Sequence, residues 1–380
     1  MLQYLKKYPL LILFAGFLFV VAIADLLVPE RSFSEMENRY LKTHPQFSLK
    51  KLLKNEYTSQ YEEYLNDQFV GRDGWITMKS VSESALGKIE NNGILYGGEG
   101  YLFEQYPKTN DKRIQNNIGF VNTFVDAYYT QVPITISIIP NSYQILDQLL
   151  PRGVQNLDQQ AYIQQIFSQI SANARSFDLV PVMQQAAGQA QAYYRTDHHW
   201  TTNGAYHAYK AFVESRGRKA VELSALEELK TQVPNFYGSY YSKCKLFSAQ
   251  PDTIDVYQIP CTSVTINGAQ KPSLHEDEKW ETRDKHAAFL WGNNGLSILR
   301  SENNLNHQQG KTSRILVVKD SYGNSFSPFL TYSYDEVWVV DLRDLGKMSE
   351  IMAQAEFDDL LILYNFMNFA SDTNLPRLTY

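Results

Sequence analysis

Cysteine and net charge are both scarce in this sequence. Its 380 residues include two cysteines, Cys244 and Cys261, and the formal net charge is only -6. Phosphate binding usually leaves a basic footprint, so this charge balance excludes nucleic acid as a partner. Neither cysteine lies beside a histidine or an acidic cluster that would indicate metal or nucleophilic chemistry. The pair is expected to form one disulfide if the chain is exported, or to remain as two thiols.

The composition is otherwise that of a folded protein. Hydrophobic residues make up 44% of the chain and charged residues 20%, which excludes the low-hydrophobicity pattern of disordered proteins. The length suits either two domains or one α/β domain with added segments. The placement of motifs must decide between these organisations.

An apolar run from Tyr8 to Val28 is the main feature of the N-terminus. Asp25 alone interrupts it, and Lys6 and Lys7 precede it. A bilayer span needs roughly 20 apolar residues, and positive residues tend to stay on the cytoplasmic side. Residues 1–28 are therefore predicted to be a membrane anchor, with the rest of the chain outside the cytoplasm.

Two alternatives to the anchor stay open. The tripeptide Ala22-Ile23-Ala24 resembles a signal-peptidase site, so the segment also fits a cleaved signal peptide. A buried core helix is the other alternative, and the terminal position and basic flank oppose it. Because the apolar run resumes at Leu26, we favour the uncleaved anchor.

Residues 29–92 are predicted to form a stalk and a helical arm. The segment 29–46 is polar and contains Pro45, whereas residues 52–86 have helical apolar spacing that two polar or glycine-rich stretches interrupt. From Gly93 to Phe103, glycine-rich punctuation between apolar pairs predicts a hairpin.

Strands alternate with helices in the remainder of the chain. Helices are expected at 157–174 and 204–215. Apolar runs typical of parallel strands buried on both faces occur at 134–139, 179–182, 315–318, 337–340 and 360–363. The fold class is therefore predicted to be α/β, in two parts at 93–217 and 314–380. Residues 218–313 between them are more polar and predict a β-rich insert.

The tetrad Asp197-His198-His199-Trp200, just before the 204–215 helix, is the strongest chemical signal. In an extended segment, residues two apart share a face, so Asp197 and His199 should point together and His198 away. A carboxylate beside an imidazole fixes its tautomer and stabilises the imidazolium that forms when it takes a proton. The pair is therefore predicted to activate a nucleophile.

Ser321 is the best candidate for that nucleophile. It follows the apolar run 315–318, and Gly323 permits a tight turn after it. Catalytic groups of open α/β sheets collect at the carboxyl ends of strands. A serine after a strand is by itself more often a helix cap. The Asp197 and His199 pair makes the nucleophile the preferred interpretation.

Zinc is the main chemical alternative at this site. His198, His199 and His207 lie close in sequence beside Asp197, and three such ligands with a water would suit catalytic zinc. Adjacent histidines diverge in an extended segment, however, and His207 falls on the following helix. We therefore expect a site with no metal and no cofactor.

These motifs resemble those of the DHHW family, named for the tetrad at 197–200, and through it the alginate O-acetylation proteins with SGNH-hydrolase-like domains. The resemblance runs from about Phe33 to the C-terminus and implies that Asp197, His199 and Ser321 form a catalytic triad. The matching segments are Ser34-Glu35-Met36-Glu37-Asn38-Arg39, Asn66-Asp67-Gln68-Phe69, the tetrad and Val318-Lys319-Asp320-Ser321-Tyr322. Lys319 departs from the family pattern, because it stands at the glycine position of a Gly-Asp-Ser-like block.

The resemblance also implies a fold. SGNH hydrolases begin with the Ser block and end with Asp-x-His, whereas here Ser321 comes last, which is the order of a circular permutation. We therefore expect a three-layer α/β sandwich of the SGNH-hydrolase type, circularly permuted, with an N-terminal membrane helix and a β-rich insert. Asn365 to Asn368 then falls at the family's Gly-x-Asn-Asp block. Asn368, and after it Asn365, is expected to donate to an oxyanion, with a turn cap as the alternative for either.

Two more residues are candidates for substrate contact. Asn293, in Trp291-Gly292-Asn293-Asn294-Gly295, fits a pocket donor, although an ordinary polar turn is the preferred interpretation. Arg343, just beyond the run 337–340, fits a partner for an anionic substrate, although a surface arginine is the preferred interpretation.

The residues alone predict an acyl-ester enzyme that forms an acyl-enzyme on Ser321. The resemblance implies O-acyltransfer, usually of acetyl, to a cell-envelope or secreted polysaccharide, with a membrane-bound O-acyltransferase as supplier of the acyl group. It also implies a location at the extracytoplasmic face of a bacterial cell envelope. A carbohydrate esterase with the same triad and a non-catalytic glycan-binding assembly protein are the alternatives.

Overall fold

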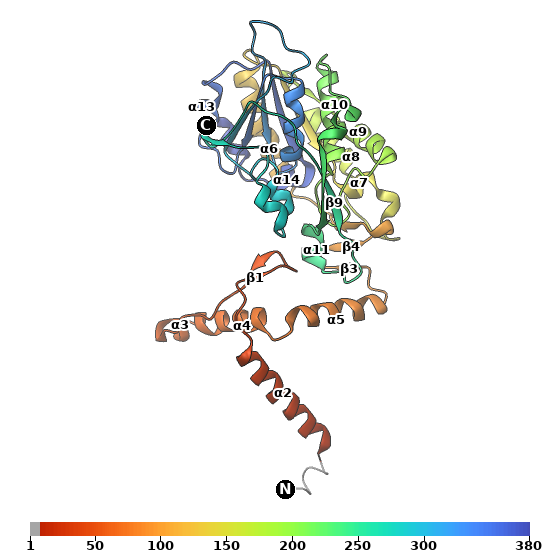
Figure 1. The fold of residues 1–380 in the computed structure, drawn as a ribbon, viewed down its shortest axis with the longest axis vertical. Helices are drawn as coiled ribbons and strands as arrows, with labels where there is room; N and C mark the ends of the chain where they lie inside the picture. Colours follow the sequence, from red (N-terminus) through yellow and green to blue (C-terminus); the bar gives the residue numbers. More distant parts are fainter. Residues whose placement is uncertain (1–7) are drawn as a thin grey trace. The chain divides into compact units, whose positions relative to one another are not determined.

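The computed structural model describes residues 8–380 and divides into two compact units (Figure 1). One unit ends at Lys88 and includes residues 245–248, and the other consists of residues 89–244 and 249–380. Lys6 and Lys7, on which the predicted membrane orientation depended, lie outside the described residues.

The first unit is mainly helical. Its elements are α2 (Pro9–Leu27), β1 (Phe33–Ser34), β2 (Arg39–Tyr40), α3 (Leu49–Leu53), α4 (Glu56–Gln68) and α5 (Arg72–Ala85). Arg39 pairs with Asp67 at 2.5 Å between Nη2 and Oδ1, and Arg72 and Lys245 both pair with Glu37. These ion pairs join the two N-terminal motifs of the family resemblance and attach the β1–β2 hairpin to α4 and α5.

The predicted membrane helix is not supported. In the part of the chain that the structure describes, no helix is both long enough and apolar enough to cross a membrane. Asp25 is the one charged residue of α2. Its Oδ1 accepts a hydrogen bond of 3.0 Å from the backbone N–H of Val70, between α4 and α5.

The second unit is a mixed α/β fold around an eight-stranded, mostly parallel sheet. The strand order is β11-β10-β12-β14-β13-β15-β6-β7, in which the five strands from β14 to β7 are parallel and the pairings of β14 with β12, β12 with β10 and β10 with β11 are antiparallel. The strands are β6 (Ile134–Ile139), β7 (Ala174–Ser176), β10 (Ser263–Ile266), β11 (Ala269–Lys271), β12 (Leu296–Arg300), β13 (Arg314–Lys319), β14 (Glu336–Asp341) and β15 (Asp359–Asn365). The predicted α/β class is confirmed.

Helices pack on both faces of this sheet. Crossovers between parallel strands are right-handed, so the β13-to-β14 connection lies on the opposite face from the β14-to-β15 connection. The contacts agree, since α6 packs with α8 and α14, whereas α10 packs with α9 and α12. These helices are α6 (Asp111–Tyr128), α8 (Gln159–Gln169), α9 (Val180–Gln189), α10 (Thr202–Ser215), α12 (Gly323–Phe326), α13 (Met348–Met352) and α14 (Phe366–Ser371).

Four of the five predicted parallel strands are confirmed, and the fifth was misplaced. Residues 134–139, 315–318, 337–340 and 360–363 lie in β6, β13, β14 and β15, whereas 179–182 begin the helix α9. Pro181 occupies its first turn, where a missing N–H costs nothing. The fifth parallel strand of the sheet is instead β7 (Ala174–Ser176). Its first residue, Ala174, is the last residue of the segment predicted as a helix at 157–174.

Residues 218–313 add strands to the main sheet and loops around its edge. The strands β10, β11 and β12 extend the sheet from β14, and β8 (Lys230–Phe236) pairs with β9 (Asp252–Tyr257) in a separate two-stranded sheet. Between them lies the short helix α11 (Ser239–Cys244). No disulfide joins Cys244 to Cys261. The predicted hairpin from Gly93 to Phe103 is present as β4 (Ile94–Tyr96) and β5 (Leu102–Glu104), and β4 also pairs with β3 (Glu90–Asn91).

A stability prediction follows from the turn after β13. A Cβ at Gly323 would lie 2.6 Å from Lys319 Cβ, and Lys319 is buried and ion-paired, so it has no room to move. Gly323→Ala should therefore lower the free energy of unfolding by about 1–3 kcal/mol, the usual cost of overpacking. Gly346→Ala is the control, because nothing lies within 4 Å of its added Cβ. Chemical denaturation measures both, and equal stability of the two variants would contradict the packing argument.

Candidate active site

Ser321 lies in the turn between β13 and α12, at the carboxyl end of the sheet. Asp320, the residue before it, is buried and ties this turn to the end of β15. Its Oδ1 accepts from the Tyr322 N–H at 3.0 Å, and its Oδ2 accepts from the Asn365 N–H and from Asn368 Nδ2, both at 2.7 Å. The position of the Ser321 hydroxyl is thus set by two neighbouring parallel strands.

The structure brings Asp197, His199 and Ser321 into one hydrogen-bonded line. His199 Nε2 lies 2.8 Å from Ser321 Oγ, and His199 Nδ1 lies 2.5 Å from Asp197 Oδ1. Asp197 and His199 are buried, whereas Ser321 is half-buried. This is the spatial order of a nucleophile, a base and the carboxylate that orients the base.

The electrostatics favour a neutral, proton-accepting His199. Burial, and then the neighbouring His198, lower the pKa of His199 to about 4, although Asp197 opposes the shift. Burial would raise the pKa of Asp197, but the two histidines hold it well below its ordinary value. At neutral pH, Asp197 is therefore a carboxylate and His199 an imidazole with a free lone pair for the serine proton.

The tetrad is bent rather than extended, so the prediction that His198 points away was wrong. Asp197 Oδ1 accepts from the backbone N–H of His199 at 3.0 Å, which closes a turn across His198. The His198 ring lies 3.8 Å from the His199 ring between centroids, and its Nδ1 is 3.6 Å from Asp197 Oδ1. Burial lowers the pKa of His198, but the attraction of Asp197 outweighs it and raises that pKa.

Trp200 explains why the fourth position of the tetrad belongs to the same motif. Its indole Nε1 donates to the Tyr322 carbonyl at 3.0 Å and to Ser325 Oγ at 3.1 Å. The Tyr322 hydroxyl in turn donates to the His198 carbonyl. The tetrad and the serine turn therefore hold each other in register through buried hydrogen bonds.

Lys319, at the usual glycine position, is buried and is accommodated by a cluster of polar partners. Its Nζ lies 3.0 Å from Asp341 Oδ2 and 3.2 Å from Asn293 Oδ1. Arg343 pairs with the same Asp341 at 2.6 Å, and Asn324 Nδ2 donates to Asn293 at 3.2 Å. Asn293 and Arg343, both predicted to contact substrate, are thus bound to the cluster around Lys319.

The two predicted oxyanion donors differ in what they contact. Asn365 is buried, its Nδ2 donates to the Ile139 carbonyl at 3.1 Å, and its Oδ1 caps α14 by accepting from the Met367 N–H. Both polar atoms of its side chain are therefore hydrogen-bonded to backbone groups, which is the turn-cap alternative. Asn368 Nδ2 donates one hydrogen to Asp320 and has a second hydrogen to offer.

Four residues that complete this site were missed, and all lie within 218–313. Gly238 is required because a Cβ there would lie 2.1 Å from Asp197 Cβ, and the Ser239 N–H donates to Asp197 Oδ2 at 2.7 Å. Asp252 accepts from the backbone N–H groups of residues 195 and 196 at 2.9 and 2.8 Å. His286 covers the base. None carries a local sequence signal, since each acts only through a long-range contact.

His286 stacks flat on the base. Its ring lies 3.7 Å from the His199 ring between centroids, with an angle of 6° between the planes. His286 is buried, and its Nε2 has no hydrogen-bond partner among the described residues. Burial and the nearby His199 hold its pKa well below the ordinary value. A neutral ring therefore shields one face of His199 from water.

Metal-binding geometry is present in part. Donor atoms of Asp197, His198 and His199 lie within 4.8 Å of one another. Both ring nitrogens of His199 already face hydrogen-bond partners, however, and binding a metal through either would break the line to Ser321 or to Asp197. His207 does not join the cluster; it lines a separate cavity beside α9 and α10.

We expect the acid limb of kcat/KM for a small ester to lie near pH 4 in the wild type, because only neutral His199 can accept the serine proton. His286→Ala should expose the stacked ring face to water. This weakens the burial that lowers the His199 pKa, so the limb should move up toward the ordinary 6.5. His286→Phe retains a flat apolar cover and should keep the limb near its wild-type position. An unmoved limb in His286→Ala would refute the shielding role.

Comparisons with known proteins identify the family and related folds. Residues 95–340 match the model of the DHHW protein family. Solved structures with a similar fold include a DHHW family protein from Eubacterium siraeum, at TM-score 0.65 and 21% identity over 76% of this chain and 95% of that one. Bacillus cereus PatB1 has TM-score 0.59 and 18% identity over 75% of this chain and 99% of its own. It has a second structure with a sulfonyl adduct, at 17% identity over 76% of this chain and 100% of that one, also at TM-score 0.59.

The O-acetyltransferase domain of Pseudomonas putida AlgJ is more distant, at TM-score 0.46 and 15% identity over 74% of this chain and 93% of that one. A comparison with curated proteins finds no match. The family model covers well over half of the chain, including the bent tetrad and the serine turn that it contacts. The chain therefore belongs to the DHHW family.

Proposed function

We propose that this chain is an O-acyltransferase, with acetyl as the expected acyl group, that acts on a cell-envelope or secreted polysaccharide outside the cytoplasm. The observation that carries the proposal is the position of His199, between Ser321 Oγ at 2.8 Å and Asp197 Oδ1 at 2.5 Å. In a buried setting, this arrangement makes a serine hydroxyl nucleophilic at neutral pH.

The sheet topology supports a circularly permuted SGNH-type scaffold. Counted from β13, the five parallel strands lie in the order second, first, third, fourth and fifth. This is one of the two common orders of doubly wound sheets, whose ligands bind where the order reverses, between the first and third strands. Ser321 follows the first strand of that count and Asn365 ends the third. The nucleophile thus lies at the switch point.

The mechanism is a double displacement. His199 Nε2 takes the proton of Ser321 as Oγ bonds to the acyl carbon of a donor ester, and the donor oxygen leaves with that proton. A hydroxyl of the acceptor then gives its proton to His199 and attacks the acyl carbon, which restores Ser321. The backbone N–H of Ser321 and the second hydrogen of Asn368 Nδ2 are the proposed oxyanion donors. Asp197 stabilises the imidazolium at each step.

The acyl donor is proposed to come from a membrane-bound O-acyltransferase, as the family resemblance implies. AlgJ, named above, is described as an O-acetyltransferase domain, and it shares less of the fold than PatB1 does. A carbohydrate esterase would use the same Ser321 and His199 with water as acceptor. A non-catalytic assembly protein would need neither side chain.

The nucleophile is tested by covalent labelling. A sulfonyl fluoride should form an adduct on Ser321 that intact-protein and peptide mass spectrometry locate, because His199 makes this hydroxyl nucleophilic. Ser321→Ala should lose the adduct and at least about a thousand-fold in ester turnover, while its unfolding free energy changes by about 1 kcal/mol or less. Ser349→Ala, at the exposed start of α13, is the control. Wild-type turnover in Ser321→Ala would refute the triad.

Transfer is distinguished from hydrolysis by how the acetyl group is divided between the glycan and water. With an acetyl ester as donor, added polysaccharide should divert acetyl from water to glycan, because both acceptors compete for one acyl-enzyme. The measurement is acetyl on the glycan against free acetate. Free acetate alone would establish the esterase instead. No turnover, with glycan binding retained in Ser321→Ala, would establish the assembly protein.

A further inference from the structure

A small pocket lies beside Asn368, the one residue of its lining that takes part in the steps described so far. It has a volume of about 360 Å³ and lies where β6 and β15 end and α11 begins, with α14 along one side. We call it the acceptor pocket and define it by Asn141, His198, Ser239, Lys243, Asn368 and Ser371. Its volume lies in the range of small-ligand sites, roughly 300–1,000 Å³.

The wall of the acceptor pocket is shared with the catalytic residues. Asn368 donates to the carboxylate of Asp320, the residue before the nucleophile. His198 Nδ1 lies 2.6 Å from Ser239 Oγ, and the Ser239 N–H binds Asp197. The buried Asn141 contacts the Tyr322 hydroxyl at 3.4 Å. A molecule in the pocket would therefore contact side chains that hold Asp320 and Asp197, the carboxylates on the two sides of the line from Ser321 to His199.

The lining selects for a neutral, hydroxyl-rich ligand. Asn141, Asn368, Ser239 and Ser371 offer uncharged amide and hydroxyl groups. Lys243 is the one lysine or arginine of the lining, and its Nζ is already neutralised by Glu104 Oε1 at 2.7 Å. A carboxylate or phosphate on the ligand would thus meet no unpaired lysine or arginine there, and it would lie near the carboxylate of Glu104 in the same lining. The imidazole of His198 already faces Asp197, with Nδ1 3.6 Å from Oδ1.

Tyr106 and Met367 add apolar surface to this polar lining. The Tyr106 hydroxyl is held by Thr109 Oγ1 at 3.0 Å, which fixes the ring. A fixed aromatic ring beside hydrogen-bonding side chains suits a sugar, which presents C–H groups on its faces and hydroxyls at its edge.

We propose that the acceptor pocket binds a neutral sugar residue of the acceptor glycan and presents one of its hydroxyls to the acyl-enzyme. This inference rests on the proposed function and specifies its second step. The sugar O–H gives its proton to His199 Nε2, its oxygen bonds to the acyl carbon, and the bond from that carbon to Ser321 Oγ breaks. The proton then passes from His199 to Ser321 Oγ, so no other reactant is needed. A bound sugar also displaces the water that would otherwise hydrolyse the acyl-enzyme.

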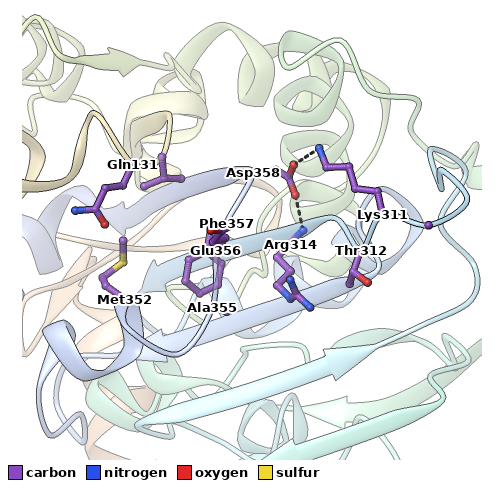
Figure 2. Close-up of a pocket in the computed structure, with 11 residues that line it drawn as sticks. Gln131, Lys311, Thr312, Arg314, Met352, Ala355, Glu356, Phe357 and Asp358 are labelled. Atoms are coloured by element: carbon purple, nitrogen blue, oxygen red, sulfur yellow. Dashed lines mark hydrogen bonds and ion pairs between the residues drawn. The ribbon is translucent and has the colours of Figure 1, made fainter.

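The cavity in Figure 2 offers a matched control site. It is larger, about 730 Å³, and lies at the opposite ends of the strands from Ser321, where β13 and β15 begin. Figure 2 shows Lys311 and the backbone of Arg314 both bound to Asp358, at 2.7 and 2.9 Å. Thr312→Trp fills this cavity far along the strands from Ser321, so it should leave the catalysis unchanged.

The test measures the ratio of transfer to hydrolysis with the full chain, an acetyl ester donor and two acceptors. The neutral acceptor is an N-acetylglucosamine tetramer and the anionic acceptor is a galacturonate tetramer. Wild type and Thr312→Trp should acetylate the neutral tetramer at least ten-fold better than the anionic one. Ser371→Trp, which places an indole over the pocket from its exposed rim, should lower the ratio for the neutral tetramer at least ten-fold.

A second variant covers the case in which Ser371→Trp does not fold. Lys243→Glu places two carboxylates at the rim, and it should lower the same ratio while weakening transfer to the anionic tetramer further. An undiminished ratio in a folded variant, or better transfer to the galacturonate, would overturn the acceptor pocket. Failure of the proposed function has a different signature, because the wild type would then form no Ser321 adduct or transfer to neither tetramer.

Discussion

The hydrogen bond between His199 Nε2 and Ser321 Oγ joins two segments that are 122 positions apart, and the geometry of the site depends on it. Neither segment could hold its partner alone, because each is a turn with few local bonds. They are held by buried polar groups that must be paired to be tolerated. The Asp320 carboxylate, beside Ser321, accepts three hydrogen bonds, and the Asp197 carboxylate, beside His199, accepts three more. Each carboxylate fixes the backbone that carries a reacting side chain.

The residues at 218–313 are best understood as part of the active site. Three of their strands extend the sheet beyond β14, which gives the segment a rigid base. From that base, Gly238 and Ser239 approach Asp197, Asp252 binds the backbone before the tetrad, and His286 covers His199. The α/β core positions Ser321 and His199, and the inserted segment shields His199 from water. That shielding is what lowers the pKa of His199.

Lys319 illustrates how a departure from a family pattern is compensated nearby. A buried ammonium is costly unless it is paired, and here Asp341 and Asn293 provide the partners. The lysine side chain also needs space beside the turn, and Gly323 supplies it by lacking a Cβ. Such a block usually has a glycine before its Asp-Ser pair. Here a lysine stands at that position, and the glycine that gives it room, Gly323, follows four residues later.

The sequence by itself determined the α/β class, four of the five predicted parallel strands and the three residues that the structure joins in one hydrogen-bonded line. These follow from short-range patterns: continuous apolar runs, a carboxylate two positions from an imidazole, and a serine after a strand. It misplaced β7 because a short apolar run with a proline suits a strand or a helix start equally well. Only the tertiary structure decided the bend that turns His198 toward Asp197, the use of Asn365 as a cap, and the roles of Gly238, Asp252 and His286. The bend and the cap rest on hydrogen bonds between residues two positions apart, and the sequence around them suits other local conformations equally well. The roles of Gly238, Asp252 and His286 depend on contacts between residues far apart in the sequence, which a local pattern does not reveal.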